Sequence, residues 1–539
     1  MLSLTVMSAA AQDAGQLQRL LEQTMPPAFT VPPQDASLQL SDTPWQEVQR
    51  LEQVRILGGP RASQMQAYWR NALGQAVSAS QLQAFWAWAQ AQLRVQGFVA
   101  EVQLEVLPGQ SGGQLLQVSV VVPKVRRVSV VVPDPQLAER YRDLISSRVL
   151  AGIELGAELN MHALDQRLEM ASHDVPLSLE AVLRPAGPAL MDVHIHVRPS
   201  SLQQEGGFRP WVQANNHGLS AYGRAQMVGA WAMPGLLPSS TASVTLQASE
   251  GVKYVRAEQE ALATVLGGRW SVWGSRSDSR TLASGSTASL AVSDELGLGL
   301  THLFAHWDDL LWQSRLEVVR RHASSRLRQS DLLVSDVQDS QLRWRWSLDN
   351  ERLLRDALRL DAMVVWGNND RNIGSAASLG RFTRVELSGR QQGRLDHAGR
   401  WLWRWQAKAQ WGQSNLDSYH RMALGGLQAV RAYTSADGVG DRGGVASLDV
   451  QYSWSFGQRV GVFYDAGRIK PWLKAPAGVF NDSYSLQAVG LTWQAQVGSA
   501  SLQTSLAKGM GGYRKAQAGE LTESKPNPLR LNMALSYSF

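Results

Sequence analysis

The chain has 539 residues, which predicts two to four domains, and 44% of its residues are hydrophobic while 18% are charged. It contains no cysteine, which excludes disulfides, thiolate metal ligands and a cysteine nucleophile. Its net charge is +6, but Lys and Arg are spread along the chain and form no basic block, so we expect no nucleic acid partner.

The N-terminal residues 1–11 are apolar and end in Ala9, Ala10 and Ala11, which is typical of a signal-peptidase cleavage site. The basic residues that normally begin a signal peptide are missing. We interpret residues 1–11 as a signal peptide remnant; the alternative is an apolar N-terminus without that role.

A short amphipathic helix is predicted over residues 12–25. Asp13 and Gln16 resemble a capping pair, and the leucines that follow, at 17, 20 and 21, lie on one helical face. A proline-rich linker over residues 26–44 follows. An extended linker of this length reaches about 60 Å, so the helix is free to lie far from the next domain.

Two α+β modules are predicted next, over residues 45–123 and 124–205. In the first, the candidate N-caps Ser78 and Ser80 precede apolar residues that share one helical face, namely Leu82, Phe85, Trp86, Ala89 and Leu93. Alternating strands follow at 102–106 and 114–122.

The second module repeats this mixture of strands and helices. We expect a strand at 125–132, a helix after Pro135 and a helix that contains Leu164 and Leu168. Two further strands are predicted at 178–185 and 191–199.

From residue 206 to 539 most of the chain alternates with period two. Tryptophan and alanine occupy one face of the segment 401–411, and Arg, Gln and Lys occupy nearly all of the other; segments 342–348, 448–456 and 489–497 behave alike. The last strand ends in Phe539.

No apolar run approaches the roughly 20 residues that a membrane-spanning helix needs, so strands are the expected means of crossing a membrane. A soluble β-sandwich also alternates, but it rarely combines a tryptophan-rich face with rows of charged residues. We therefore predict a transmembrane antiparallel β-barrel of about 16 strands, because closure satisfies every backbone hydrogen bond and leaves a polar interior. Tryptophan also suits the girdles at the membrane interfaces.

The longest break between clear strands runs from about residue 412 to 442, which is too long for a simple hairpin loop. Two strands later, the alternation of residues 460–467 assigns Val462 and Tyr464 to the lipid face and so places Phe463, Asp465 and Gly467 inside the barrel. A carboxylate in that position favours a cation partner, and the planar guanidinium of Arg431 is suited to bind it. The alternative is that Asp465 is a solvated lumen charge and Arg431 lies in a surface loop.

Three short motifs carry a family resemblance: VRAY at 430–433, GDRG at 440–443 and FYDAG at 463–467. They resemble the VRG(F/Y) and F-x-D-x-G signatures of the polypeptide-transporting barrel superfamily. The whole layout resembles the TpsB transporters of two-partner secretion, which combine an N-terminal helix, a linker, two POTRA domains and a sixteen-stranded barrel.

The resemblance implies roles for these motif residues. Val430, Arg431, Ala432 and Tyr433 would form the tip of the sixth extracellular loop. Phe463, Asp465 and Gly467 would form its partner motif on strand thirteen of the barrel. Ala432 departs from the usual glycine, and a positive φ at that position would cost roughly 1 kcal/mol.

The resemblance also implies a location and a set of partners. The barrel would contact outer-membrane lipid in a Gram-negative bacterium as a monomer, and periplasmic POTRA domains would receive an unfolded secreted TpsA-type exoprotein, an adhesin, haemolysin or toxin. The helix at 12–25 would plug the resting lumen. Possible lumen-lining residues are Arg343, Arg345, Arg404 and Lys408, although ordinary solvated lumen charges explain them equally well.

Other functions find less support in the sequence. His194 and His196 share a strand face, but no third metal ligand is evident, and we expect no cofactor and no enzymatic activity. A barrel-assembly factor of the same superfamily usually carries three or five POTRA domains. A diffusion porin or receptor needs no such modules, and an autotransporter carries its passenger in the same chain.

Overall fold

The computed structural model describes residues 47–95, 97–132, 153–173, 177–199, 210–237, 240–263, 268–282, 288–307, 310–349, 357–374, 378–396, 399–455, 457–477, 481–510, 524 and 527–539. The predictions for the signal peptide remnant, the helix at 12–25, the linker at 26–44 and the helix after Pro135 lie outside these residues. The chain forms two compact units, one within residues 33–204 and one that includes the chain from residue 205 onward.

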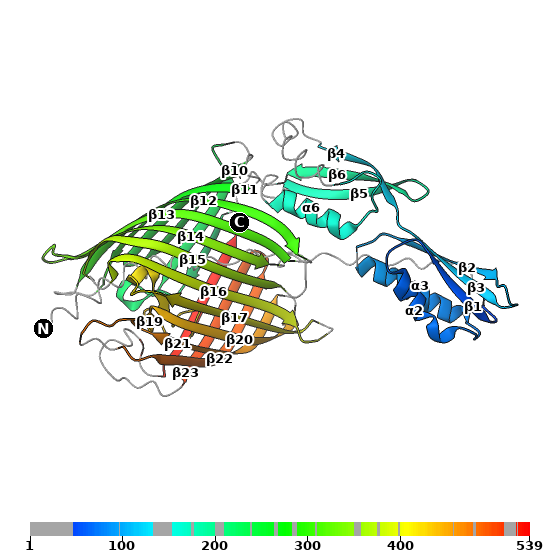
Figure 1. Cartoon of the computed structure of the whole chain (residues 1–539). Coiled ribbons are helices and arrows are strands. Elements are labelled where there is room, and N and C mark those ends of the chain that lie inside the picture. Colours follow the sequence, from blue (N-terminus) through cyan, green and yellow to red (C-terminus); the bar gives the residue numbers. More distant parts are fainter. Residues whose placement is uncertain are drawn as a thin grey trace. The chain divides into compact units, whose positions relative to one another are not determined.

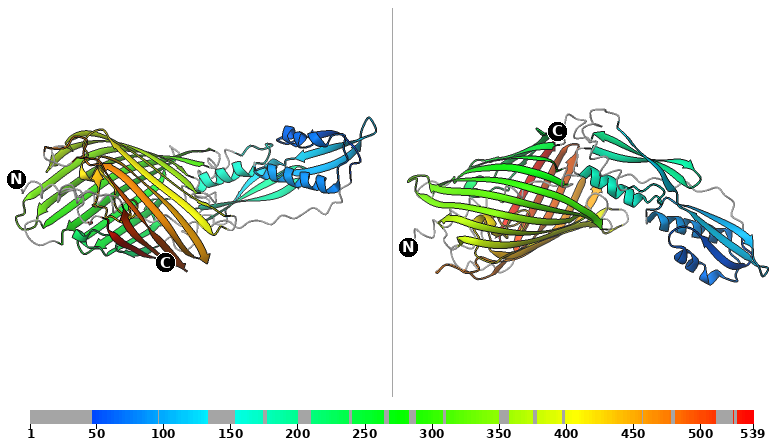
Figure 2. Two further views of the ribbon diagram at one scale, coloured as in Figure 1. Left: turned by 90° about the horizontal axis from the view of Figure 1, so that it is seen from below. Right: turned by 45° about the horizontal axis from the view of Figure 1, so that its top comes forward.

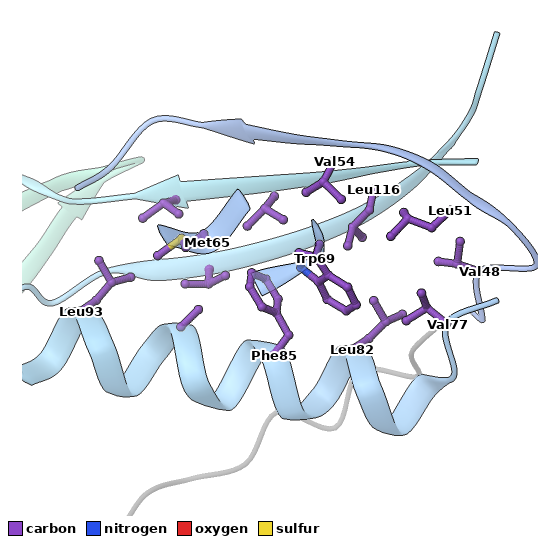
Figure 3. Packing of buried hydrophobic residues seen from close by; sticks show 14 of the residues in the cluster. Val48, Leu51, Val54, Met65, Trp69, Val77, Leu82, Phe85, Leu93 and Leu116 are labelled. Carbon is purple, nitrogen blue, oxygen red and sulfur yellow. The ribbon is translucent and has the colours of Figure 1, made fainter. Parts of the chain in front are cut away.

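The first module pairs a three-stranded sheet with helices. Its elements are β1 (Leu51–Leu57), α2 (Ala62–Tyr68), η1 (Arg70–Ala72), α3 (Ala79–Val95), β2 (Glu101–Pro108) and β3 (Gln114–Val121). The sheet order is β1-β3-β2, with β1 parallel and β2 antiparallel to β3. Figure 3 shows Leu82 and Phe85 of α3 pointing toward the sheet, where Leu51 and Leu116 belong to the same buried cluster.

Local sequence signals account for α3. Ser78 acts as its N-cap, because its Oγ accepts a hydrogen bond from the backbone N–H of Gln81, whose side chain accepts one from the Ser78 N–H in return. Trp86 lies at the edge of the core and donates its indole N–H to the carbonyl of Val102 at 2.9 Å. The helix thus begins directly after Ser78, one of the two candidate N-caps.

Strand β1 and helix α2 were not predicted from the sequence. In β1, Leu51 and Val54 are both buried although they are three residues apart, because the register with β3 shifts between Leu51 and Gln53. This irregularity breaks the period-two signal by which a strand is recognised.

The second module has the same topology as the first. Strands β4 (Lys124–Val131), β5 (Leu177–Gly187) and β6 (Leu190–Pro199) form a sheet of order β4-β6-β5, and α6 (Met161–His173) packs with it. As in the first module, one outer strand, β4, is parallel to the central strand β6, and the other, β5, is antiparallel to it. Leu164 and Leu168 of α6 share a buried core with Val193 and Ile195.

An ion pair links two strands of the second module. Arg126 binds Asp192 bidentately, with its Nε 2.9 Å from Oδ1 and its Nη2 2.6 Å from Oδ2. The hydrogen bond and the charge of Arg126 lower the pKa of the Asp192 carboxyl below its usual value. Because Arg126 is half exposed, this pair adds little to stability.

The second unit is a closed antiparallel barrel of sixteen strands (Figure 1), which confirms the predicted fold class. Its strands are β7 (Trp211–Asn215), β8 (Gln226–Pro234), β9 (Ser240–Ser249), β10 (Val252–Ala263), β11 (Gly268–Arg280), β12 (Ser289–Trp307), β13 (Leu310–Leu327), β14 (Leu333–Asp349), β15 (Leu358–Ile373), β16 (Gly380–Arg394), β17 (Trp401–Gly412), β20 (Arg442–Ser455), β21 (Gln458–Lys470), β22 (Tyr484–Val497), β23 (Ala500–Met510) and β24 (Leu529–Ser538). The last strand, β24, pairs with the first, β7.

The two faces of the barrel wall differ as the alternation predicts. The strands run obliquely around the barrel (Figure 2), and apolar side chains such as Trp411 and Leu491 are exposed on the outside. In β24 the outward residues Leu529, Leu531 and Leu535 are exposed, while Asn532 and Ala534 are buried inside. Among the described residues, no helix is long and apolar enough to cross a bilayer.

Candidate functional site in the barrel lumen

The segment between β17 and β20, residues 413–441, is mostly buried from Leu416 to Gly438, with Gln428 exposed. It contains one short 3-10 helix, η5 (Ser418–His420), and a small hairpin of β18 (Met422–Ala423) and β19 (Val439–Gly440). Its side chains contact inward-facing residues of β13, β14, β20 and β21. The segment therefore folds into the lumen, and we call it the lumen loop.

The tip of the lumen loop is a tight turn over 430–433. The N–H of Tyr433 donates to the carbonyl of Val430 at 3.1 Å, and the N–H of Val430 donates to Leu424 at 3.0 Å. Ala432 is not among the described non-glycine residues with positive φ. The replacement of the usual glycine by Ala432 therefore brings no left-handed backbone strain.

Arg431 projects from this turn onto Asp465 of β21. Its backbone N–H and its Nε donate to Oδ2 at 3.0 Å and 2.9 Å, and its Nη2 donates to Oδ1 at 2.7 Å. The side chain of Arg431 is 5% exposed and that of Asp465 is fully buried. Such a bidentate, charge-assisted contact compensates for removing both charges from water.

The neighbouring strand β20 completes the site around the guanidinium. Asp449 Oδ1 accepts from Arg431 Nη1 at 2.8 Å, and Ser447 Oγ accepts from Nη2 at 2.8 Å while it donates to Asp465. The guanidinium also stacks on the ring of Phe463, with 3.4 Å between its Cζ and the ring centroid. The result is one cation held by two carboxylates, a hydroxyl and an aromatic face.

The backbone of the tip is tied to a further strand. Asn532 of β24 donates its side-chain N–H to the carbonyl of Arg431 at 3.1 Å and to Ser505 Oγ of β23 at 3.2 Å. The tip is therefore held by residues from β20, β21 and β24, and Ser505 of β23 helps to position Asn532.

Glycines on three adjacent strands leave room for the lumen loop and for the ring of Phe463. A Cβ at Gly467 of β21 would overlap the side chain of Leu424, which belongs to the loop. A Cβ at Gly490 of β22 would overlap the ring of Phe463, and one at Gly509 of β23 would lie 2.9 Å from the hydroxyl of Tyr433. The motif glycine thus acts by its lack of a side chain.

The four basic residues predicted as possible lumen lining have different surroundings. Arg404 lies beside Asp449, with Nη2 3.5 Å from Oδ2, and so adds a second cation next to the two buried carboxylates. Arg343 contacts Glu295 and the lumen loop residue Tyr419. Lys408 Nζ lies 3.4 Å from Glu386, and Arg345 is exposed, with a contact to the Met363 sulfur.

Sequence reasoning missed Ser447, Asp449 and Asn532 as members of the site. Asp449 had one available signal, since it lies on the polar face of the alternating segment 448–456. Nothing in the local sequence marked it as a partner of Arg431, because the convergence depends on the pairing of Asp449 with Phe463 across β20 and β21.

The histidine pair considered as a metal site has a simpler setting. The ring Nδ1 of His194 lies 2.6 Å from the hydroxyl oxygen of Ser129 on the neighbouring strand. Within the described parts of the chain, no group of three or more histidine or acidic residues has an arrangement suited to a metal ion.

Comparison with known proteins supplies the identity. The family model described as "Haemolysin secretion/activation protein ShlB/FhaC/HecB" matches residues 203–478, which is just over half of the chain. The chain belongs to this family. It is thus a TpsB transporter, as its motifs predicted, and an outer-membrane transporter of two-partner secretion.

Solved structures agree with the fold of this TpsB chain. CdiB from Escherichia coli matches with a TM-score of 0.60 at 16% identity, covering 97% of this chain and 96% of that one. CdiB from Acinetobacter baumannii matches with a TM-score of 0.59 at 15% identity, covering 99% of each. BamA from Haemophilus ducreyi lacking POTRA domains 1-3 gives 0.52 at 13% identity, covering 91% and 100%.

A direct comparison with curated proteins finds no match. The family match and the shared fold confirm the predicted location of this TpsB transporter, the outer membrane with POTRA domains in the periplasm.

Proposed function

We propose that this chain is the translocation pore for a partner exoprotein, which its two periplasmic modules receive unfolded and which leaves through the barrel to the cell surface. The observation that carries the proposal is the lumen loop, which occupies the interior of a closed barrel and is held there by Arg431. A loop that occupies a pore and is held to its wall by polar contacts is suited to move when a client enters.

The two modules offer a physical route to client recognition. Each three-stranded sheet has two outer strands, β1 and β2 in the first and β4 and β5 in the second. An outer strand presents unpaired backbone groups, and an unfolded client can add a strand there with little demand on its sequence. We assign residues 45–123 to the first of these modules and residues 124–205 to the second.

The proposal assigns roles to the motif residues and to the partner. Val430, Arg431, Ala432 and Tyr433 form the tip that holds the lumen loop, and Phe463, Asp465 and Gly467 form its seat on the wall. The client is a secreted TpsA-type adhesin, haemolysin or toxin, and its folding outside the cell drives transport, since the periplasm offers no ATP. The pore acts as a monomer in outer-membrane lipid.

Secretion of the exoprotein encoded beside this chain tests the proposal. We expect the exoprotein in the medium of cells that make the full chain. In cells that make a chain without residues 47–199, the exoprotein should stay inside. The shortened chain should still form a barrel whose electrophoretic mobility changes on heating. Equal secretion by both chains would contradict a receiving role for the modules. A different outcome would indicate a barrel-assembly factor: in cells that lack the chain, other membrane proteins fail to insert while export of the exoprotein is unchanged.

A further inference from the structure

A second buried cluster lies at the start of the lumen loop, away from Arg431. Asp417, Tyr419 and His420 are all buried, and none of them belongs to a motif that the sequence indicated. Their partners are on β12, β13, β14, β16 and β17, whereas the Arg431 site is built from β20, β21, β23 and β24.

An ion pair between the loop and the wall forms the centre of this cluster. Arg321 of β13 donates from Nη2 to Asp417 Oδ2 at 2.8 Å and from Nε to Asp339 Oδ2 of β14 at 2.8 Å. Arg321 is 1% exposed and Asp417 is 8% exposed. Because Arg321 is also paired with Asp339 on the wall, loss of the Asp417 charge does not leave it without a counter-ion.

Tyr419 adds an independent contact to the same wall. Its hydroxyl donates to Glu295 Oε2 of β12 at 3.0 Å, and Nη2 of Arg343 on β14 donates to both of these oxygens at 3.2 Å. The tyrosine ring lies under the guanidinium of Arg321, with 4.3 Å between that Cζ and the ring centroid. Glu295 is also held by the indole N–H of Trp273 at 3.2 Å.

The backbone of the loop is bound at the next residue. The carbonyl of His420 accepts from Arg384 Nη1 of β16 at 3.0 Å and from Gln410 Nε2 of β17 at 2.8 Å. Its imidazole packs on Phe382, with 4.5 Å between the ring centroids. Arg384 and Gln410 thus bind the backbone of the loop, in addition to the wall contacts of the Asp417 and Tyr419 side chains.

The two clusters hold the loop on different parts of the barrel. In the closed strand order, β14, β15, β16, β17 and β20 separate β13, which carries Arg321, from β21, which carries Asp465. Within the described part of the chain, none of the hydrogen bonds around Arg321 involves a residue of the Arg431 cluster. A loop fixed at two such places reaches across the lumen from one wall to the other.

We propose that Asp417 and Tyr419 are positioning residues that form a second anchor of the lumen loop, and that this anchor opens independently of Arg431. The inference rests on the proposed function for its biological meaning, because each anchor then opens a different part of the pore to the client. Release at Arg431 alone leaves the first part of the loop, around residue 418, on its wall.

Thiol labelling tests the two anchors without a client. The chain has no cysteine, so Ser418→Cys and Ser435→Cys place single, nearly isosteric thiols at two buried loop positions, one directly after Asp417 and one four residues after Arg431. Each is combined with Asp417→Asn or Asp465→Asn, and the rate of reaction with a water-soluble maleimide is measured on the purified full chain in detergent. The assay needs no secretion, so its outcome is separate from that of the proposed function.

We expect Asp417→Asn to raise labelling at position 418 at least about tenfold, which corresponds to ~1.4 kcal/mol, and to leave position 435 unchanged. Asp465→Asn should do the opposite. Tyr419→Phe, which removes one hydroxyl, should give a smaller rise at 418, and Asp417→Glu, which keeps the charge, should label more slowly there than Asp417→Asn.

Asp336→Asn is the matched control. Asp336 lies on β14 like Asp339, but it pairs with Arg371 and His322 of the wall and has no described contact with the loop. It should change neither labelling rate, and all variants should keep the heat-dependent mobility of a folded barrel. Unchanged labelling at 418 in folded Asp417→Asn, or an equal rise at both positions in either variant, would overturn two independent anchors.

Discussion

Arg431 and Asp465 are joined by three hydrogen bonds, one from the backbone N–H of Arg431 and two from its guanidinium. The contact thus fixes both the direction of the side chain and the position of the turn that carries it. A lysine in place of Arg431 retains the charge but lacks the planar fork that binds Asp465, Asp449 and Ser447 together.

Arg431→Ala should strongly reduce secretion of the exoprotein. The substitution removes the Arg431 cation from the buried Asp465 carboxylate, while Asp449 keeps its contact with Arg404. Breaking a buried pair on one side typically costs roughly 3–5 kcal/mol. We expect more than a tenfold loss of exoprotein in the medium, with Asp465→Ala equally impaired and Arg431→Lys only partly active.

Arg326→Ala serves as its control, because Arg326 forms an exposed ion pair with Asp331 at one end of β13. It should secrete normally, since exposed pairs contribute little. Normal secretion by both Arg431→Ala and Asp465→Ala would rule out a functional role for the contact.

Gly467→Ala should displace the lumen loop without changing any charge. The new Cβ would overlap Leu424, so the loop must shift or the strand must bend. We expect higher single-channel conductance in planar bilayers and impaired secretion. Gly444→Ala on β20 is the matched change, because its Cβ would meet only ordinary contacts, the nearest at 3.5 Å from the Lys408 carbonyl. Equal conductance of the two variants would argue against the spacing role of Gly467.

Phe85→Ala should unfold the first module and spare the barrel. Phe85 is fully buried between α3 and the sheet, and removing a buried phenylalanine costs about 3–5 kcal/mol. Limited proteolysis of the full chain should show cleavage within residues 47–121, while the barrel keeps its heat-dependent mobility. Gln83→Ala, on the exposed side of the same helix, should resist the protease like the parent. Equal resistance of Phe85→Ala would mean that this core does not determine the stability of the module.

Deletion of residues 12–25 should raise conductance across planar bilayers. The expectation rests on the amphipathic pattern of Leu17, Leu20 and Leu21 and on the linker that follows. Deletion of residues 1–11 is the control and should leave conductance unchanged. An identical conductance for both deletions would contradict a plug formed by residues 12–25 in the resting pore.

The period of the sequence was enough to predict which strand residues face the lumen. Successive side chains of a strand point to opposite faces, so an apolar Val462 and Tyr464 place Phe463 and Asp465 inside. The same reasoning identified α3 from Phe85 and its capping serine. It failed for β1, where an irregular register puts Leu51 and Val54 on the same side.

What the sequence alone determined is therefore local: the strand faces, the helix with its cap, and the motif residues that a family resemblance singled out. The tertiary structure decided which inward residues meet. Asp449 reaches Arg431 through the pairing of β20 with β21, and Arg321 meets Asp417 across 96 positions of chain. The physical reason is that hydrophobic alternation repeats in every strand, whereas barrel closure and loop insertion bring together polar groups that no local pattern connects.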